Sequence, residues 1–366
     1  MPYRQFDRTK LLMKPLSCRV NKKKIEVDRV LITDAPANLG EEAKAIIAGF
    51  AERIRRARED KRPVMLSFGA HTIKNGLAPV LIYLIENGWV THLATNGAGI
   101  IHDWEFAYQG ETSEDVRANV AKGEFGAWQE TGFYINLALL IGAYEGKGYG
   151  ESVGAMIHHE QLYIPSKEEL ESTANDNMRD NPERSAGAMD LSAAICAFDL
   201  KAGSMKIPHP YKRYSVQAKA FELKAPFTGH PMFGHDIIYM HPLNSGAAIG
   251  RAAQRDFLAF VENVSRISGG AYISVGSAIM SPMIFEKAIS MSQNLAIQAG
   301  RRIEGHSILV VDIAKSNWDW SKGEPPEDSP EYYLRYNKSF SRMGGTMNYL
   351  SADNRDFLLA LAQELL

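Results

Sequence analysis

The feature that most constrains the fold is a strand–helix–strand pattern within residues 63–100. Residues 64–70, VMLSFGA, form a short apolar run that is typical of a buried strand. Residues 71–88 predict a helix that ends at Gly88, and residues 89–100, WVTHLATNGAGI, predict a second strand running into a glycine-rich turn. Both strands are apolar throughout, as parallel strands covered on both faces are. The pattern therefore predicts an α/β fold: a Rossmann-like parallel sheet with helices on both faces.

The same alternation returns in the last third of the chain. We expect strands at 235–242, 271–278 and 306–313, and helices at 39–59, 247–267, from Ser281-Pro282 onward and at 351–366. Ser166 and Glu169 form a capping box that opens another helix. Residues 203–233 predict an ordered loop. We expect one domain over 1–366, with an N-terminal arm (1–38) that is solvated or contacts another subunit, and an inserted region (111–225) of uncertain structure.

Composition narrows the class of protein. The chain has 366 residues, of which 45% are hydrophobic and 23% charged, with a net charge of −2. This balance is globular and offers no electrostatic reason to bind nucleic acid or a membrane surface. Two cysteines are too few for a disulfide framework, and no apolar segment is long enough for a signal peptide or a membrane span. We therefore expect a cytoplasmic protein.

Two neighbouring features point to a ligand site. The turn Gly97-Ala98-Gly99 follows a predicted strand, where glycines let backbone N–H groups approach a pyrophosphate, but the full GxGxxG fingerprint is incomplete. A plain tight turn is equally compatible with it. His102 and Asp103 come next. They are either helix-start residues or part of a βα loop facing a ligand at the carboxyl ends of the strands.

Other candidates have ordinary explanations beside the functional ones. His230, His235, Asp236 and His241 include metal-ligand types, but their spacing fits no common zinc motif, and structural or pocket-edge roles are favoured. Lys338 follows several aromatic residues. Desolvation there would lower its pKa and activate it as a nucleophile, although most lysines are simply solvated. The chain has no GxSxG, P-loop or HExxH motif, which leaves serine hydrolases, P-loop ATPases and zincins without support.

Taken together, these segments resemble the deoxyhypusine synthase family. The likeness lies mainly in 64–110 and 230–366, and the segments that carry it are 66–103, 228–241, 273–288 and 332–361. It implies an NAD site lined by His71, Thr72, Asn96, Gly97, Ala98, Ser277, Ala278 and Asp353. It also implies an imine-forming lysine at Lys338, and a substrate pocket that includes His102, Asp236, Glu331 and Tyr336. A homotetramer with sites at subunit interfaces is implied as well.

The resemblance predicts an NAD-dependent aminobutyl transferase that takes spermidine or a related amine through a lysine imine. The acceptor would be a protein lysine or a small amine, the latter giving a homospermidine synthase-type activity. The sequence departs from the family pattern where Pro282 replaces a catalytic histidine and His230 replaces a cofactor-contacting aspartate. These departures motivate one alternative, a catalytically silent NAD-binding protein. A separate alternative is an NAD-dependent dehydrogenase of a small polar substrate, in which Lys338 has no role.

Overall fold

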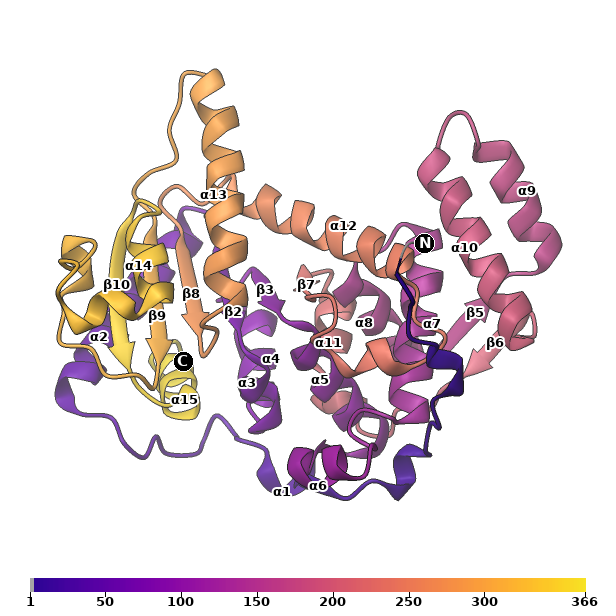
Figure 1. The fold of residues 1–366 in the computed structure, drawn as a ribbon. Helices are drawn as coiled ribbons and strands as arrows, with labels where there is room; N and C mark the ends of the chain where they lie inside the picture. Colours follow the sequence, from indigo (N-terminus) through magenta and orange to yellow (C-terminus); the bar gives the residue numbers. More distant parts are fainter. Residues whose placement is uncertain (1–2) are drawn as a thin grey trace.

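A six-stranded parallel sheet organises the protein, whose computed structural model describes residues 3–366 (Figure 1). Across the sheet the strands are β10 (Thr346–Ser351), β9 (Ser307–Asp312), β8 (Ala271–Val275), β2 (Val64–Phe68), β3 (His92–Thr95) and β7 (Phe227–Gly229). All five neighbouring pairs are parallel. In order of occurrence along the chain, the strands lie 6-5-4-1-2-3, which is the Rossmann order. The predicted fold class is confirmed.

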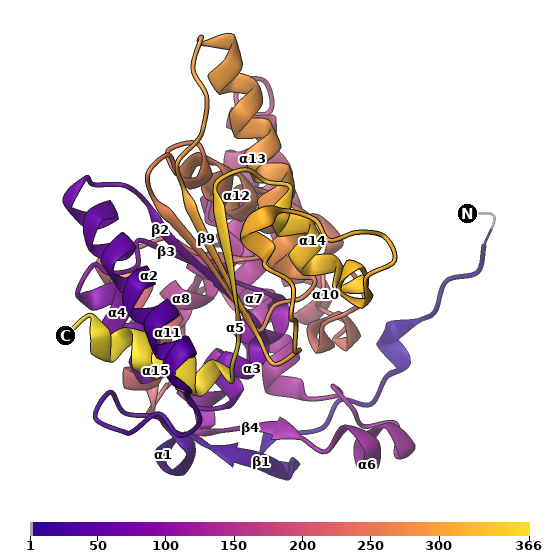
Figure 2. The same ribbon diagram turned by 90° about the vertical axis from the view of Figure 1, so that its left-hand side faces the viewer.

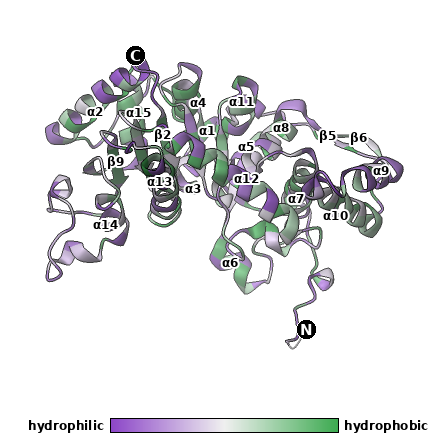
Figure 3. Ribbon diagram, turned by 90° about the horizontal axis from the view of Figure 1, so that it is seen from above, coloured by the Kyte–Doolittle hydropathy of each residue, from purple (hydrophilic) through white to green (hydrophobic). Residues whose placement is uncertain are grey.

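Alternate residues of each strand face two different helical layers. On one face Leu66, Leu93 and Leu309 pack with α2 (Glu41–Glu59), α4 (Ala78–Glu86) and α15 (Asn354–Glu364). On the other face Met65 and Ile308 pack with α12 (Gly246–Val264), α13 (Met280–Gln298) and α14 (Arg335–Ser341). Figure 3 shows the apolar strands inside and polar residues along the outer turns of α2 and α9. Period-2 side-chain alternation on a sheet buried on both faces explains why these strands are apolar throughout.

A helical region lies beside β7 and contains most of the inserted residues (Figure 1). It comprises α5 (Gly97–Gln109), α7 (Gln129–Glu145), α8 (Tyr149–His159), α9 (Lys167–Asn177), α10 (Pro182–Phe198) and α11 (Val216–Leu223), with the hairpin strands β5 (Gln161–Ile164) and β6 (Gly203–Lys206). Ser166 caps α9 as predicted, since its hydroxyl accepts a hydrogen bond from the Glu169 N–H. The long helix α12 packs against both α7 and α13 and so joins this region to the sheet.

The N-terminal segment is packed against the body of the protein, so the expectation of a solvated arm is wrong for residues 14–30. Strand β1 (Asn21–Lys24) pairs antiparallel with β4 (Glu111–Glu114), and both lie below the sheet in Figure 2. The short helices α1 (Ile25–Asp28) and α6 (Val116–Ala121) flank this pair. Leu16 and Ile25 are buried. A free arm would leave these apolar side chains in water, so their burial stabilises the packed conformation.

Five segments differ from the sequence-based expectation. Residues 203–233 are not a loop throughout, since they contain β6, α11 and β7. The predicted helix at 71–88 is divided into α3 (Ala70–Lys74) and α4, because Gly76 adopts a φ of 82° between them. Residues 235–242 are not a strand: Ile237–Met240 form a short 3-10 helix, and the neighbouring strand β7 lies inside the predicted loop. Strand β10 was not predicted. Helix α13 begins at Met280, so Ser281 is inside the first turn rather than its N-cap.

Within residues 3–366, no helix combines the length and the apolar character needed to cross a membrane.

Candidate functional site

The carboxyl edge of the sheet is the natural place for a ligand. The strand order reverses between β2 and β8, and open α/β sheets bind ligands in the crevice at this point. The two loops that follow these strands pack closely: the Gly69 N–H donates to the Val275 carbonyl at 3.0 Å. A methyl group at Gly69 would overlap the Gly276 carbonyl, and one at Gly276, whose φ is 55°, would overlap the Asn354 amide. Glycine therefore allows the close approach of backbone at Gly69 and of the Asn354 side chain at Gly276.

All eight residues predicted to bind the cofactor lie at this edge. They follow four different strands: His71 and Thr72 follow β2, Asn96, Gly97 and Ala98 follow β3, Ser277 and Ala278 follow β8, and Asp353 follows β10. His71, Ala278 and Asp353 are exposed, whereas Thr72, Gly97 and Ser277 are buried. The fold thus brings together segments that are far apart in the sequence. For example, the side chains of Thr72 and Asn354, 282 positions apart, are in contact at this edge. Their binding role stays a prediction.

The glycine-rich turn is the first turn of α5. Asn96 is its N-cap, and the Asn96 side-chain oxygen accepts a hydrogen bond from the Gly99 N–H at 2.9 Å. A helix N-terminus presents unpaired N–H groups and a partial positive charge. The Asp236 carboxyl group packs against Gly97, where a methyl group would overlap it. The absence of a side chain at Gly97 thus admits an acidic group to the beginning of α5.

A cavity of about 600 Å³ opens beside this helix. It contains His102 and Asp236, two of the predicted substrate-binding residues, and Ala98 from the predicted cofactor cradle. Its remaining lining comes from the N-terminal segment, α3, α5, and the stretch from β4 to Phe125: Arg19, Lys22, Lys74, Ile101, Glu105, Ser113, Glu114, Asp115, Val116, Arg117, Phe125, His235 and Ile237. We call it the α5 cavity. The cavity shares Ala98 with the predicted cofactor residues, and Asp236 in its lining packs against Gly97.

Asp236 is the acidic group best suited to exchange a proton in the α5 cavity. Burial raises the pKa of its carboxyl group to about 7. One of its oxygens, Oδ2, is buried and has no hydrogen-bond partner among the described residues. At neutral pH both protonation states of such a group are populated, which is the condition for general acid–base catalysis.

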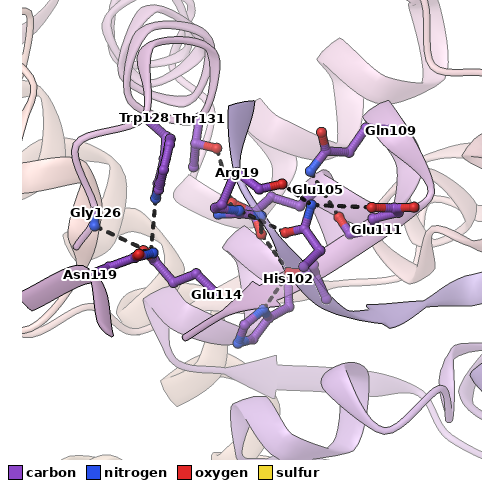
Figure 4. A network of polar contacts seen from close by, with 12 residues as sticks. Arg19, His102, Glu105, Gln109, Glu111, Glu114, Asn119, Gly126, Trp128 and Thr131 are labelled. Carbon is purple, nitrogen blue, oxygen red and sulfur yellow. Dashed lines mark hydrogen bonds and ion pairs between the residues drawn. The ribbon is translucent and has the colours of Figure 1, made fainter. Parts of the chain in front are cut away.

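The imidazole of His102 is held by a hydrogen bond (Figure 4). The Thr112 hydroxyl donates to Glu105, so it must accept from His102 Nδ1, 2.7 Å away. Burial lowers the pKa of His102 to about 4. Nδ1 therefore carries the proton, and Nε2 is the acceptor. The orientation of the imidazole is set by the Glu105–Thr112–His102 chain.

The residue beside it, Asp103, has a structural role. Its carboxylate accepts hydrogen bonds from the Ser215 hydroxyl and from the Val216 and Gln217 N–H groups. Asp103 thereby accepts hydrogen bonds from the N–H groups at the beginning of α11, and it does not line the cavity. Of the two neighbouring candidates, His102 is therefore part of the cavity, whereas Asp103 caps a helix.

A buried ion pair supports the cavity wall. The Arg19 guanidinium makes two 2.7 Å hydrogen bonds to Glu105, and both side chains are 1% exposed. Glu105 also accepts from the Thr131 hydroxyl at 3.0 Å. Below it, Glu114 accepts from the Trp128 indole N–H at 3.0 Å and from the Gly126 N–H (Figure 4). These bonds fix the N-terminal segment, β4 and α7 around the histidine.

Ser113 and Lys74 add two features to the cavity. Ser113 is buried with a φ of 71°, a conformation that strains a residue with a side chain and is often found at functional sites. Lys74 has a lowered pKa because it is partly buried and lies near Lys23 and Lys22. In the described part of the chain no carboxylate forms an ion pair with Lys74, whereas Lys22 pairs with Asp115 at 2.9 Å. Lys74 and Arg117, which also lines the cavity and forms no ion pair among the described residues, are therefore cations available to an anionic group.

Lys338, Glu331 and Tyr336 lie elsewhere. Lys338 is on α14, with its ammonium 3.1 Å from the Glu324 carboxylate and 3.2 Å from the centre of the Tyr332 ring. Hydrogen bonding to Tyr332, followed by the contact with Glu324, raises the pKa of Lys338. The expectation of a lowered pKa is therefore wrong, because the neighbouring aromatic ring and the carboxylate both stabilise the ammonium.

The other two predicted pocket residues are engaged locally. Glu331 accepts hydrogen bonds from the Ser329 hydroxyl and from the Asn317 N–H. The Tyr336 hydroxyl lies 3.4 Å from that of Tyr349. Neither residue lines the α5 cavity. In one chain the structure therefore joins His102 and Asp236 but does not bring Lys338, Glu331 and Tyr336 to them.

The histidine cluster does not converge. His230 is buried with a ring nitrogen 2.9 Å from the Thr228 hydroxyl, and burial lowers its pKa to about 3. His241 contacts Gln129, and His235 is exposed at the cavity rim. Among residues 3–366, no three His, Cys, Asp or Glu side chains are placed to share a metal ion.

Sequence reasoning missed most of the groups that hold His102. The spacing of His102 and Glu105, three residues apart on one helix, is a signal that could have paired them on one face. Arg19, 86 residues before Glu105, carries no such signal. Only the folding of the N-terminal segment onto α5 brings it there.

Comparison with known proteins gives distant similarity in structure alone. No family model matches the chain, and no curated protein does. A conserved LOR/SDH protein from Methanococcus maripaludis S2 is 14% identical, with a TM-score of 0.39 over 90% of this chain and 69% of that one. AgrE, solved as a ternary complex with ornithine and NAD+, is 13% identical, with a TM-score of 0.44 over 90% of this chain and 34% of that one.

ArgZ, an arginine dihydrolase from the ornithine-ammonia cycle in cyanobacteria, is 15% identical, with a TM-score of 0.39 over 88% of this chain and 32% of that one. The protein thus spans about a third of the AgrE and ArgZ chains. At these identities and TM-scores the similarity carries no conclusion about activity.

Proposed function

We propose that this protein is an NAD-dependent enzyme that acts on an amine or amino-acid substrate held in the α5 cavity. The observation that carries the proposal is the contact between the predicted cofactor cradle and the cavity at Gly97 and Ala98. It places a carboxyl group with a pKa of about 7 beside the beginning of α5.

The residues at the carboxyl edge fit a dinucleotide. The backbone N–H groups of Gly97 and Ala98, in the first turn of α5, would donate to a pyrophosphate. NAD bound there would supply a hydride acceptor for the carbon that bears the amine. The amine nitrogen would lose a proton in the same conversion.

The chain's own residues would manage that proton and orient the substrate. Asp236, as the carboxylate, would take the proton from the nitrogen. His102 Nε2 would accept a hydrogen bond from the substrate, since Nδ1 is committed to Thr112. Lys74, which has no carboxylate partner in residues 3–366, would pair with a substrate carboxylate or a phosphate.

The first test measures NAD binding by calorimetry and then NADH formation with a panel of amines and amino acids. Ornithine, which is bound in the ternary complex of AgrE, and spermidine come first. If Asp236 is the base, kcat/KM rises with pH up to about pH 7 and then levels, because the carboxylate is the active form. Asp236→Asn would remove this limb and lower kcat at least about 100-fold.

Glu364→Gln, a change of the same type on the last residue of α15, is the matched control and should leave kcat unchanged. No NAD binding by the wild-type protein would exclude the proposal. Tight NAD binding without turnover of any amine would favour the catalytically silent alternative.

The narrower proposal, based on the resemblance to deoxyhypusine synthase, is aminobutyl transfer through an imine on Lys338. Since Lys338 does not line the α5 cavity of its own chain, this reaction requires a second subunit to bring it there. Incubation with NAD and spermidine, then borohydride, should give an aminobutyl adduct that Lys338→Ala abolishes. Mixed oligomers of Lys338→Ala and Asp236→Asn should regain activity, since each supplies what the other lacks.

Lys74→Ala is the discriminating variant in the same assay. An adduct lost in Lys74→Ala and kept in Lys338→Ala would reject Lys338 and assign the imine to the α5 cavity. NADH released without any adduct would support a simple dehydrogenase instead.

A further inference from the structure

A second cavity, of about 1200 Å³, lies at the opposite edge of the sheet, where the strands begin. Four connections form it: α2 to β2, α4 to β3, α12 to β8 and α13 to β9. Three of them contribute cationic side chains: Lys61 and Arg62, with Arg58 from the end of α2, precede β2, Arg266 precedes β8, and Arg301 and Arg302 precede β9. We call it the amino-edge cavity.

Its charge differs from that of the rest of the molecule. Glu304 is the one acidic residue in the lining, against six cations. The whole chain has a net charge of −2, so the remainder of the protein is acidic on balance. Six like charges around one open cavity repel one another, and an anion bound among them would relieve that repulsion.

Two of the cations have structural explanations. The Arg58 guanidinium stacks on the Trp89 ring at 4.1 Å, and Arg266 lies 3.6 Å from the Glu262 carboxylate. Arg58 is also in the last turn of α2, where the helix dipole favours a cation. Arg58 and Arg266 alone would therefore not indicate an anion-binding site.

The other four have no such explanation. Lys61, Arg62, Arg301 and Arg302 make no ion pair with any carboxylate in residues 3–366. Arg62 lies beyond the C-cap Asp60, and the two arginines lie beyond the C-cap Ala299. The dipole effect fades within the last turn of a helix, so it does not account for them.

One wall of the cavity is apolar. Ile303, Ala296 and Leu295 line it, and Leu295 is 68% exposed. A ligand that contacts both the cationic residues and the apolar wall would carry several negative charges at one end and a flat or apolar group at the other. We propose that the amino-edge cavity binds a nucleoside polyphosphate, with its phosphates on Arg62, Arg301 and Arg302 and its base against Leu295. A long nucleic acid fits less well, because the protein outside the cavity is acidic on balance.

This site is separate from the proposed NAD and amine site, which lies at the other end of the strands. It does not depend on the proposed function. A regulatory ligand bound here would reach the carboxyl edge only through the strands and the helices α2, α12 and α13.

The test is calorimetric titration of the full chain with ATP, inorganic tripolyphosphate, NAD and a single-stranded RNA. ATP should bind the wild-type protein, and more tightly than tripolyphosphate, which lacks the base. The double variant Arg301→Glu/Arg302→Glu should weaken ATP binding at least about ten-fold, and raised salt should weaken it too. NAD binding should be unchanged in this variant.

The control variant is Arg179→Glu/Lys201→Glu, an equal charge reversal on exposed residues of the distant α9–α10 region. It should bind ATP like the wild type, and the melting temperatures of both variants report whether they fold. Absence of ATP binding, ATP binding unaltered by the Arg301/Arg302 change, displacement of ATP by NAD, or tighter binding of RNA than of ATP would each overturn the proposal.

Discussion

The network around His102 shows how single residues couple a buried charge to a candidate site. Glu105 accepts hydrogen bonds from Arg19, Thr112 and Thr131, and through Thr112 it sets which nitrogen of His102 carries the proton. Desolvation alone would raise the pKa of Glu105, but the Arg19 charge and these hydrogen bonds leave it lowered. A carboxylate can therefore stay ionised in the core only because its partners are supplied there.

Removal of one member of this ion pair should be far more harmful than removal of both. Arg19→Ala leaves the Glu105 carboxylate buried without its countercharge, and we expect a loss of about 3–5 kcal/mol in the free energy of unfolding. Arg19→Met combined with Glu105→Met should lose clearly less. Urea unfolding of the two variants measures the difference. A single variant as stable as the wild type would show that the pair is solvated.

At the scale of elements, glycines divide into those that permit a close approach and those that only weaken a helix. Gly69 lies where the β2 loop meets the β8 loop, and a methyl group there would overlap backbone. Gly49 in α2 and Gly250 in α12 have nothing within 4 Å of an added methyl group. The same substitution should therefore have opposite effects at these positions.

Gly49→Ala and Gly250→Ala should each stabilise the protein by about 0.5–1 kcal/mol, because alanine has the higher helix propensity. Gly69→Ala should destabilise it, because the Gly276 carbonyl cannot move without disturbing β8. Thermal unfolding compares the three variants. An equally stabilising Gly69→Ala would mean that the two loops are further apart than the structure shows.

Two lysines that end helices offer a second comparison at this scale. Lys61 after α2 and Lys224 after α11 both adopt a φ of 54°, which favours glycine. Lys61→Gly and Lys224→Gly should each stabilise the protein by about 1 kcal/mol. Only Lys61→Gly should also weaken ATP binding, since only Lys61 lines the amino-edge cavity. Equal ATP affinity in the two variants would remove Lys61 from that site.

For the whole molecule, buried titratable groups predict how stability depends on pH. Burial lowers the pKa of five histidines to about 3 or 4: His92, His102, His209, His230 and His241. Burial raises the pKa of two aspartates, Asp236 and Asp256, to about 7. The two sets act in opposite directions between pH 4 and pH 6.5.

The histidines should dominate. Below their unfolded pKa of about 6.5, the unfolded state binds protons that the folded state excludes, so stability falls as the pH falls. The aspartates bind protons in the folded state and gain stability over the same range, but they are fewer. The urea midpoint should therefore drop between pH 7 and pH 5, and drop further in Asp256→Asn, whose opposing contribution is lost. A midpoint that rises on acidification would contradict this balance.

Several features of the protein were determined by the sequence alone. Apolar runs of strand length, separated by helical segments, specify a parallel sheet buried on both faces, because only that arrangement covers such strands. The residues that follow these strands in the chain, such as Asn96-Gly97-Ala98 and Ser277-Ala278, therefore had to meet at one edge. The predicted cofactor residues lie together because they follow strands of one parallel sheet.

Only the tertiary structure decided which groups surround the α5 cavity. Arg19 reaches Glu105 because the N-terminal segment packs on β4, a pairing that depends on long-range burial and leaves no periodic trace in the sequence. Asp236 meets Gly97 as the N-cap of the 3-10 helix Ile237–Met240, where the sequence predicted a strand over residues 235–242. The pKa of Lys338 was likewise set by neighbours, Glu324 and Tyr332, whose contact the linear spacing did not reveal. Local pattern specifies elements, whereas burial and charge pairing between distant segments specify the site.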